Sequence, residues 1–284
     1  MHGPPNATLA LARRPLLAAL PAACLAPRRA AADAGEWRRF TDRFLAPDGR
    51  IVDTGNDGVS HSEGQGWGLM LAAVANDRDA FERIRGWTQR VLKRPHDHLH
   101  AWRFRPGATP AIDDPNNATD GDLYIAWGLL LGAERWRQPA WRNEAVAIGH
   151  DILRLTLRRP RGLALLLPGA AGFDSGEGVV LNPSYIAIPA FAALARAMPE
   201  APWPAIARDG LELLRRARFG AWGLSPDWVL LPPGQEPLRL PSRWPPRFSF
   251  DAVRVPLLLA WAGEANHPAV GGAAAFWSDA RWPA

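Results

Sequence analysis

Three short acidic segments contain the residue types that acid–base chemistry requires. Each holds one or two carboxylates among small, hydrogen-bonding or apolar residues: 60–68, 117–122 and 248–256. The central acids are Glu63, Asp120 and Asp251. A carboxyl group among apolar groups has a raised pKa, which suits a general acid, whereas one beside a cation stays ionised, which suits a general base. Because two such groups can together cleave a glycosidic bond, the pattern predicts a polysaccharide hydrolase.

The first segment has two interpretations. Three glycines within residues 64–68 would let a sugar chain approach the backbone beside Glu63, and the apolar surface of Trp67 would favour its protonated form. Alternatively, Ser62 and Gln65 form a capping box, and Glu63 is only an acid in the first turn of a helix.

The other two segments also leave alternatives open. Asp120 and Asp122 could be helix N-terminal acids, with Thr119 or Asp120 as the cap, but Asn117 before them suggests a polar floor that faces a ligand. Asp251 and Arg254 are three residues apart and would share one helix face. Apolar neighbours predict that this pair is buried and that the guanidinium holds Asp251 ionised. The alternative is a surface ion pair of little energetic consequence.

The elements that must position these acids are predicted to be helices. After a first helix near residues 37–45, apolar residues recur with helical spacing in eight further segments: 66–76, 79–92, 120–136, 141–157, 183–197, 203–219, 249–262 and 268–277. Pro- and Gly-rich loops separate them, and no strand–helix alternation indicates a parallel α/β barrel. The chain is therefore predicted to be all-α, with successive helix pairs forming an α/α toroid.

Composition narrows the class of protein further. The chain has 284 residues, 48% of them hydrophobic, which predicts one sizeable folded domain over residues 35–284. Its formal charge of +5 arises partly from residues 1–34, which hold four arginines and one acid. The remainder carries no basic stripe, so nucleic acid is not an expected partner.

Residues 1–34 are predicted to be a secretory signal. Arg13 and Arg14 precede a short apolar run, and small residues follow it. We expect a secreted or periplasmic bacterial protein, exported by the general or the twin-arginine route, without stable membrane insertion. A flexible, uncleaved N-terminus is the alternative. Cleavage near Ala32 or Ala34 would remove Cys24, the one cysteine, and with it any disulfide or thiolate metal site.

The three acidic motifs resemble glycoside hydrolase family 8, and most closely its branch associated with bacterial cellulose synthesis. The likeness extends from about Trp37 to the C-terminus. It implies an (α/α)6 barrel that hydrolyses β-1,4-glucans with inversion. It also implies Glu63 as general acid, Asp251 as general base, and Asp120 as the residue that orients the sugar and the attacking water.

The same resemblance, together with the 14 tryptophans, suggests where glucan binds. Aromatic rings offer flat apolar faces to sugars, although most tryptophans are expected to pack in the core. The predicted substrate-binding residues are Trp102, Tyr185, Arg254, Asp122, Asn117 and Gln65. Neither cofactor nor metal is expected, and the alternating His96, His98 and His100 are interpreted as a solvated loop.

The chain is short after its last motif compared with this family, so the predicted toroid lacks its last helices. Together these features predict an inverting endo-β-1,4-glucanase that acts on cellulose-like chains. Its task would be to trim glucan during cellulose synthesis, with the export machinery as a further partner. The main alternative is a non-catalytic polysaccharide-binding or export-complex subunit. An α/α-toroid lyase or a phosphorylase fits less well, because neither a basic cluster beside Glu63 nor a phosphate site is visible.

Overall fold

A computed structural model describes residues 34–279 and residue 281. Residues 1–33 of the predicted signal segment, Cys24 among them, lie outside the described residues. The α-helices in the described part are α1 (Ala34–Phe44), α2 (Ser62–Ala75), α3 (Arg78–Val91), α4 (Thr119–Trp136), α5 (Pro139–Thr156), α6 (Ile188–Ala197), α7 (Trp203–Arg216), α8 (Arg254–Trp261) and α9 (Pro268–Trp277). The prediction of an all-α fold is confirmed.

Helix α2 packs against α3, α4 against α5 and α6 against α7, because their apolar faces meet, and α2 also packs against α4. Helix α4 is apolar nearly all round and contacts α2, α5 and α6, so it lies at the centre of the main core. Asp77 caps α3 by accepting a hydrogen bond from the backbone N–H of Ala80 at 2.9 Å. Leu214, Val255, Leu259 and Ala269 form a smaller cluster that joins α7, α8 and α9.

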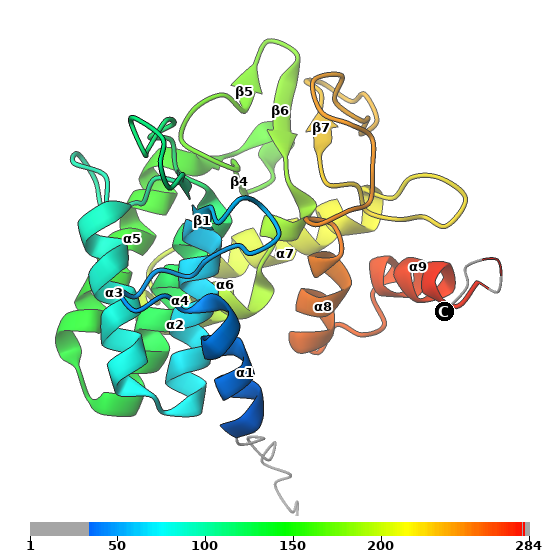
Figure 1. The fold of residues 1–284 in the computed structure, drawn as a ribbon. Helices are drawn as coiled ribbons and strands as arrows, with labels where there is room; N and C mark the ends of the chain where they lie inside the picture. The colour runs from blue at the N-terminus through cyan, green and yellow to red at the C-terminus, as the bar shows by residue number, and fades with distance from the viewer. Residues whose placement is uncertain (1–33, 280, 282–284) are drawn as a thin grey trace, which may run out of the picture. The chain divides into compact units, whose positions relative to one another are not determined.

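Short strands interrupt the long loops. They are β1 (Ser60–His61), β2 (Arg103–Phe104), β3 (Leu157–Arg158), β4 (Leu165–Leu166), β5 (Asp174–Ser175), β6 (Gly178–Leu181) and β7 (Val229–Leu231), with 3₁₀ turns η1 (Pro160–Gly162) and η2 (Pro183–Tyr185). All pairings are antiparallel; β1 pairs with β2, β3 with β4, and β6 lies between β5 and β7. Figure 1 shows the labelled strands gathered at one end of the helices. The loops therefore build a surface over that end of the helices.

Several predicted boundaries differ from the structure. Helix α2 begins at Ser62 rather than Gly66, so Glu63 lies within its first turn. The segment predicted as one helix over 183–197 divides into η2 and α6, and the helix predicted from Ser249 begins only at Arg254. Asp251 therefore lies in a turn before α8.

Apolar side chains remain exposed on two helices. Leu71 and Val74 of α2 are 37% and 44% exposed, and Leu257 and Trp261 of α8 are 54% and 53% exposed. Within the described residues, no helix combines the length and the apolar character that a membrane span would need.

Candidate active site

The first two acids lie on a tightly packed helix pair. Glu63 and Asp120 occupy the first turns of α2 and α4, and these two helices contact each other along their length. A Cβ added to Gly66 would lie 2.5 Å from the Cβ of Tyr124, and one added to Gly121 would lie 2.8 Å from the backbone nitrogen of Glu63. The glycines thus let the backbones approach closely, and that approach brings the two carboxylates together.

This packing corrects one prediction. The glycines after Glu63 were expected to make room for a sugar chain, but Gly66 and Gly68 are buried. Gly66 faces Tyr124, and Gly68 faces the side chains of Ile51 and Ile84. Their role is helix packing.

Arg254, at the first position of α8, joins the two carboxylates to the third. Its Nη1 contacts Glu63 Oε1, and its Nη2 lies 3.2 Å from Asp120 Oδ2 and 2.7 Å from Asp251 Oδ1. Nη2 also donates a hydrogen bond to the Ser184 hydroxyl at 2.8 Å. One guanidinium therefore gathers three acids from α2, α4 and the turn before α8.

The three carboxylates differ in exposure. The side chains of Glu63 and Asp251 are 32% and 30% exposed, whereas that of Asp120 is 2% exposed. Glu63 and Asp251 can thus reach a bound molecule, and Asp120 lies beneath them. A hollow of about 370 Å³ opens beside Glu63, between α1 and α2, and is lined in part by Trp67 and His61.

Burial dominates the electrostatics of this cluster. It raises the pKa of the Asp120 carboxyl against the opposing effect of the Arg254 charge, and the nearby carboxylates of Glu63 and Asp251 add to the rise. Burial likewise raises the pKa of Asp251, while Arg254 opposes it. Arg254 thus acts on Asp251 in the predicted direction, towards the ionised form, but removal of the carboxyl from water has the larger effect.

The burial predicted for the Asp251–Arg254 pair is correct for only one partner. The Arg254 side chain is 11% exposed, but Asp251 is 30% exposed, and Phe250 beside it is 90% exposed. The apolar residues around Asp251 do not enclose it, because the segment is a turn and not a helix with a buried face.

The aromatic residues predicted to bind glucan lie beside the cluster. The backbone carbonyl of Trp102 accepts a hydrogen bond from the Ser62 N–H at 3.0 Å, and its indole stacks on His61 with ring centroids 5.8 Å apart. The Tyr185 ring centroid is 6.0 Å from the Arg254 guanidinium carbon. Both rings are partly exposed. Their contact with substrate remains a prediction.

Three other predicted ligand-binding residues lie behind the cluster instead. Gln65 is fully buried and accepts a hydrogen bond from the Ile51 N–H at 2.6 Å while donating to the Thr88 hydroxyl at 2.9 Å. It forms no capping box with Ser62, because its amide is bonded to these groups. The Gln65 side chain therefore stabilises the loop at Ile51 and helix α3 at Thr88, and it is too deeply buried to contact a ligand.

Asp122 and Asn117 belong to a similar buried network. Asp122 accepts hydrogen bonds from the backbone N–H of His100 at 2.9 Å and from the Asn117 amide at 3.0 Å, and it also contacts the His100 ring. Asn117 in turn accepts from the Ala170 N–H at 2.8 Å. Substrate binding by these two residues has no support in this geometry, because their polar atoms hold loops together.

The histidines of the 96–100 loop do not converge. His98 contacts Asp151 at 2.7 Å, whereas His100 contacts Asp122 at 2.9 Å. The prediction of a solvated loop is wrong for His100, which is fully buried. Within residues 34–279 and 281, no cluster of three or more His, Cys, Asp or Glu side chains could hold a metal ion.

Sequence reasoning missed two further groups at the site. Ser184 contacts Arg254, and the buried Asp227 contacts the segment that carries Asp251. An aspartate that follows a proline in an otherwise apolar stretch was the one available signal for Asp227. It is weak, because such residues commonly initiate turns.

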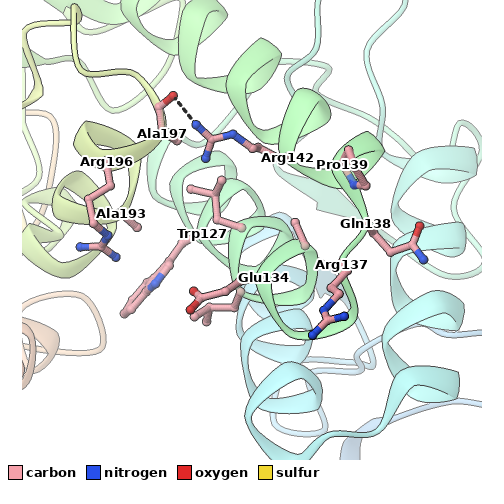
Figure 2. A pocket seen from close by; sticks show the side chains of 12 residues that line it. Trp127, Glu134, Arg137, Gln138, Pro139, Arg142, Ala193, Arg196 and Ala197 are labelled. Carbon is pink, nitrogen blue, oxygen red and sulfur yellow. Dashed lines mark hydrogen bonds between the residues drawn. The ribbon is translucent and has the colours of Figure 1, made fainter. Parts of the chain in front are cut away.

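A second hollow, of about 470 Å³, lies between α4, α5 and α6 (Figure 2). Trp127, Glu134, Arg142 and Arg196 are among the residues that line it, and Arg142 donates to the Ala197 carbonyl at 3.0 Å. None of the three clustered acids lines this hollow. The candidate site is therefore the carboxylate cluster around Arg254.

Comparison with known proteins identifies the family of this chain. Residues 10–276 match the model of a family described as glycosyl hydrolases family 8. The chain belongs to this family. It is 42% identical over 229 residues to a probable endoglucanase of Novacetimonas hansenii and 41% identical over 241 residues to an endoglucanase of Cellulomonas uda. It covers 67% and 66% of those proteins, which cover 81% and 84% of this chain.

Solved family 8 structures share the same arrangement of helices. The endo-β-1,4-glucanase CMCax from Acetobacter xylinum superposes with a TM-score of 0.81 at 40% identity, over 86% of this chain and 76% of that chain. A family 8 endo-β-1,4-glucanase from an Achatina fulica gut metagenomic library gives a TM-score of 0.84 at 39% identity, over 90% of this chain and 80% of that chain. This family 8 chain thus spans about two thirds of the length of the curated relatives and somewhat more of the solved ones.

Proposed function

We propose that this chain is an endo-β-1,4-glucanase that hydrolyses cellulose-like glucans with inversion at the anomeric carbon. The observation that carries the proposal is the grouping of two part-exposed carboxyl groups and one buried carboxyl group around a single guanidinium. The names of the relatives at about 40% identity support the choice of substrate.

Each acid has a distinct task in this mechanism. Water attacks the anomeric carbon as Asp251 accepts one of its protons, and Glu63 donates a proton to the glycosidic oxygen as that bond breaks. The products are two shorter glucans, one with a new hydroxyl at the attacked carbon. Asp120, buried between the other two acids, orients the sugar and the water by hydrogen bonding.

The decisive experiment measures reducing-end release from soluble carboxymethyl-cellulose by the full chain. Glu63→Gln and Asp251→Asn should each lower kcat at least ~100-fold. Glu82→Gln is the matched control, because its half-exposed carboxylate pairs with the surface residue Arg78, away from the three acids. The control should retain the parent's activity.

The outcomes separate the candidate functions. An active parent that loses activity in both site variants, but not in the control, supports the hydrolase. An inert parent that still binds the glucan favours the polysaccharide-binding subunit. If the parent is active and both site variants remain active, the assignment of the acids is wrong. Following the anomeric configuration of fresh product by NMR tests inversion, because retention would contradict the single-displacement step.

We further propose that the protein is exported and trims glucan as cellulose is made, in contact with the export machinery. The basic and apolar N-terminal sequence and the resemblance to the cellulose-synthesis branch support this role. The mature N-terminus, determined by mass spectrometry on the exported protein, should fall near residues 32–35. Deletion of the gene should change the extruded cellulose, and unchanged cellulose would contradict the role.

A further inference from the structure

Asp227 is a buried acid whose carboxylate accepts three hydrogen bonds from residues 249–252. It is 2% exposed and precedes Trp228 and strand β7. Its Oδ1 accepts hydrogen bonds from the backbone N–H groups of Ser249 and Ala252, both at 2.9 Å. Its Oδ2 accepts from the Ser249 hydroxyl at 2.5 Å. Asp227 therefore holds the backbone both before and after Asp251 in the sequence.

The segment around Asp251 needs such support because it has no regular structure of its own. Helix α8 begins only at Arg254, and residues 249–253 are turns and bends. Backbone N–H groups removed from water need partners, and here one carboxylate supplies two of them. Acceptance by an ionised group makes these bonds stronger than neutral ones.

Asp227 is itself held firmly by the sheet. Strand β7 is buried and pairs with β6, with Leu181 opposite Val229. Strand β6 leads directly into η2, whose Ser184 contacts Arg254. The paired strands β6 and β7 therefore fix the positions of Ser184, which contacts Arg254, and of Asp227, which holds the segment of Asp251.

We propose that Asp227 is the positioning residue for the general base: its carboxylate fixes the turn that holds the Asp251 carboxyl beside Arg254. This role rests on the proposed hydrolytic function, in which Asp251 takes the proton from water. Asp227 acts through Asp251 and does not contact the reacting atoms.

The charges that face Asp251 give this role a measurable signature. They are Arg254 on α8, Glu63 on α2, Asp120 on α4 and Asp227 itself, with the Tyr185 hydroxyl of η2 and the amide of Asn182 just before it. The Arg247 guanidinium lies 3.3 Å from Asp227 Oδ2 and offsets part of the Asp227 charge. Burial raises the pKa of Asp251, and the negative charge of Asp227 raises it further, while Arg254 and Asn182 lower it. Removal of the Asp227 charge should therefore lower the pKa of Asp251. The acidic limb of the activity profile, where the base becomes ionised, should move to lower pH.

Two substitutions in the full chain separate geometry from charge. Asp227→Asn keeps an oxygen that can accept both backbone bonds but loses the charge. It should retain kcat/KM within ~10-fold and move the acidic limb down by roughly half to one pH unit. Asp227→Ala loses both, and because a small misplacement of a catalytic group is costly, kcat/KM should fall ~100-fold.

Asp209 supplies the matched control. It is also buried, at 8% exposed, and it accepts a hydrogen bond from the Ala164 N–H at 2.8 Å, so it holds a different loop. Asp209→Asn and Asp209→Ala should lower stability without moving the acidic limb. The proposal is overturned if Asp227→Ala stays within two-fold of the parent, if the limb does not move in Asp227→Asn, or if Asp209→Asn moves it equally.

Hydrogen–deuterium exchange makes the test independent of activity. In Asp227→Ala, residues 249–253 should exchange faster than in the parent while the amides of α2 and α4 stay protected. If the parent proves inert on glucan, the proposed function fails, but this local loss of protection still supports positioning by Asp227. Unchanged exchange at residues 249–253 would overturn it.

Discussion

The two sides of the carboxylate cluster are built in different ways. On the Glu63 side, two helices pack so closely that Gly66 has no room for a Cβ against Tyr124. On the Asp251 side, the acid lies in a turn next to a 90% exposed Phe250 and is held by Asp227 and Arg254. The position of Glu63 therefore depends on the small volume of the glycines between the two helices. The position of Asp251 depends on ion pairing and hydrogen bonding. Arg254 is the group that couples them.

Removal of this coupling should have the largest effect. Arg254→Met leaves the buried Asp120 and the part-exposed Glu63 and Asp251 without their cation, and breaking a buried ion pair costs about 3–5 kcal/mol of unfolding free energy. Because Arg254 lowers the pKa of both Asp120 and Asp251, its loss should also move the acidic limb of kcat/KM to higher pH. Urea unfolding and a pH profile measure the two effects. Arg254→Lys is the charge-preserving control, and a limb unchanged in Arg254→Met would contradict the coupling.

A volume change should disturb only the helix-packed side. In Gly66→Ala, the new Cβ meets Tyr124 and the backbone of Ile125 at 2.5–2.8 Å, which should cost about 2–3 kcal/mol of unfolding free energy. Gly64→Ala is the control two residues earlier, where the nearest atom lies at 3.5 Å. It should be neutral or stabilise the helix by about 0.5–1 kcal/mol. Equal losses in both variants, measured by urea unfolding, would show that close packing is not the cause.

The buried acid between the two sides should make stability depend on pH. The folded state raises the pKa of Asp120 to about 8, so the unfolded chain releases this proton first. The contribution of Asp120 is therefore fully present below pH 4 and is lost as the pH rises towards 8. Asp120→Asn should match the parent in stability at pH 4 and should gain on it by about 1.4 kcal/mol for each pH unit towards pH 8. An identical difference at both pH values would contradict the raised pKa.

The smallest effect is expected at the rim of the site. Trp102→Ala removes a partly exposed ring next to the start of α2, so KM for carboxymethyl-cellulose should rise about 5-fold with kcat little changed. Trp277→Ala is the control, because this 56% exposed tryptophan ends α9. Unchanged KM in Trp102→Ala, or an equal rise in the control, would remove Trp102 from the binding surface.

Local patterns in the sequence were sufficient for a large part of this description. Helical spacing of apolar residues predicted α3, α4, α5 and α9 to within two residues at each end, because amphipathic periodicity is a property of short segments. The three acids were found from their immediate neighbours. Burial of Arg254 also followed from the apolar residues around it.

The tertiary structure alone decided which groups meet. Gln65 and Asp122 look as suitable for ligand binding as Glu63 in the sequence, yet contacts with Ile51 and His100 bury them. The bonds from Asp227 to the Asp251 segment span more than twenty residues, and Arg254 collects acids from three separate elements. The sequence by itself determined the helices and the types of acid available. Long-range packing determined their exposure and partners, because both depend on residues far away along the chain.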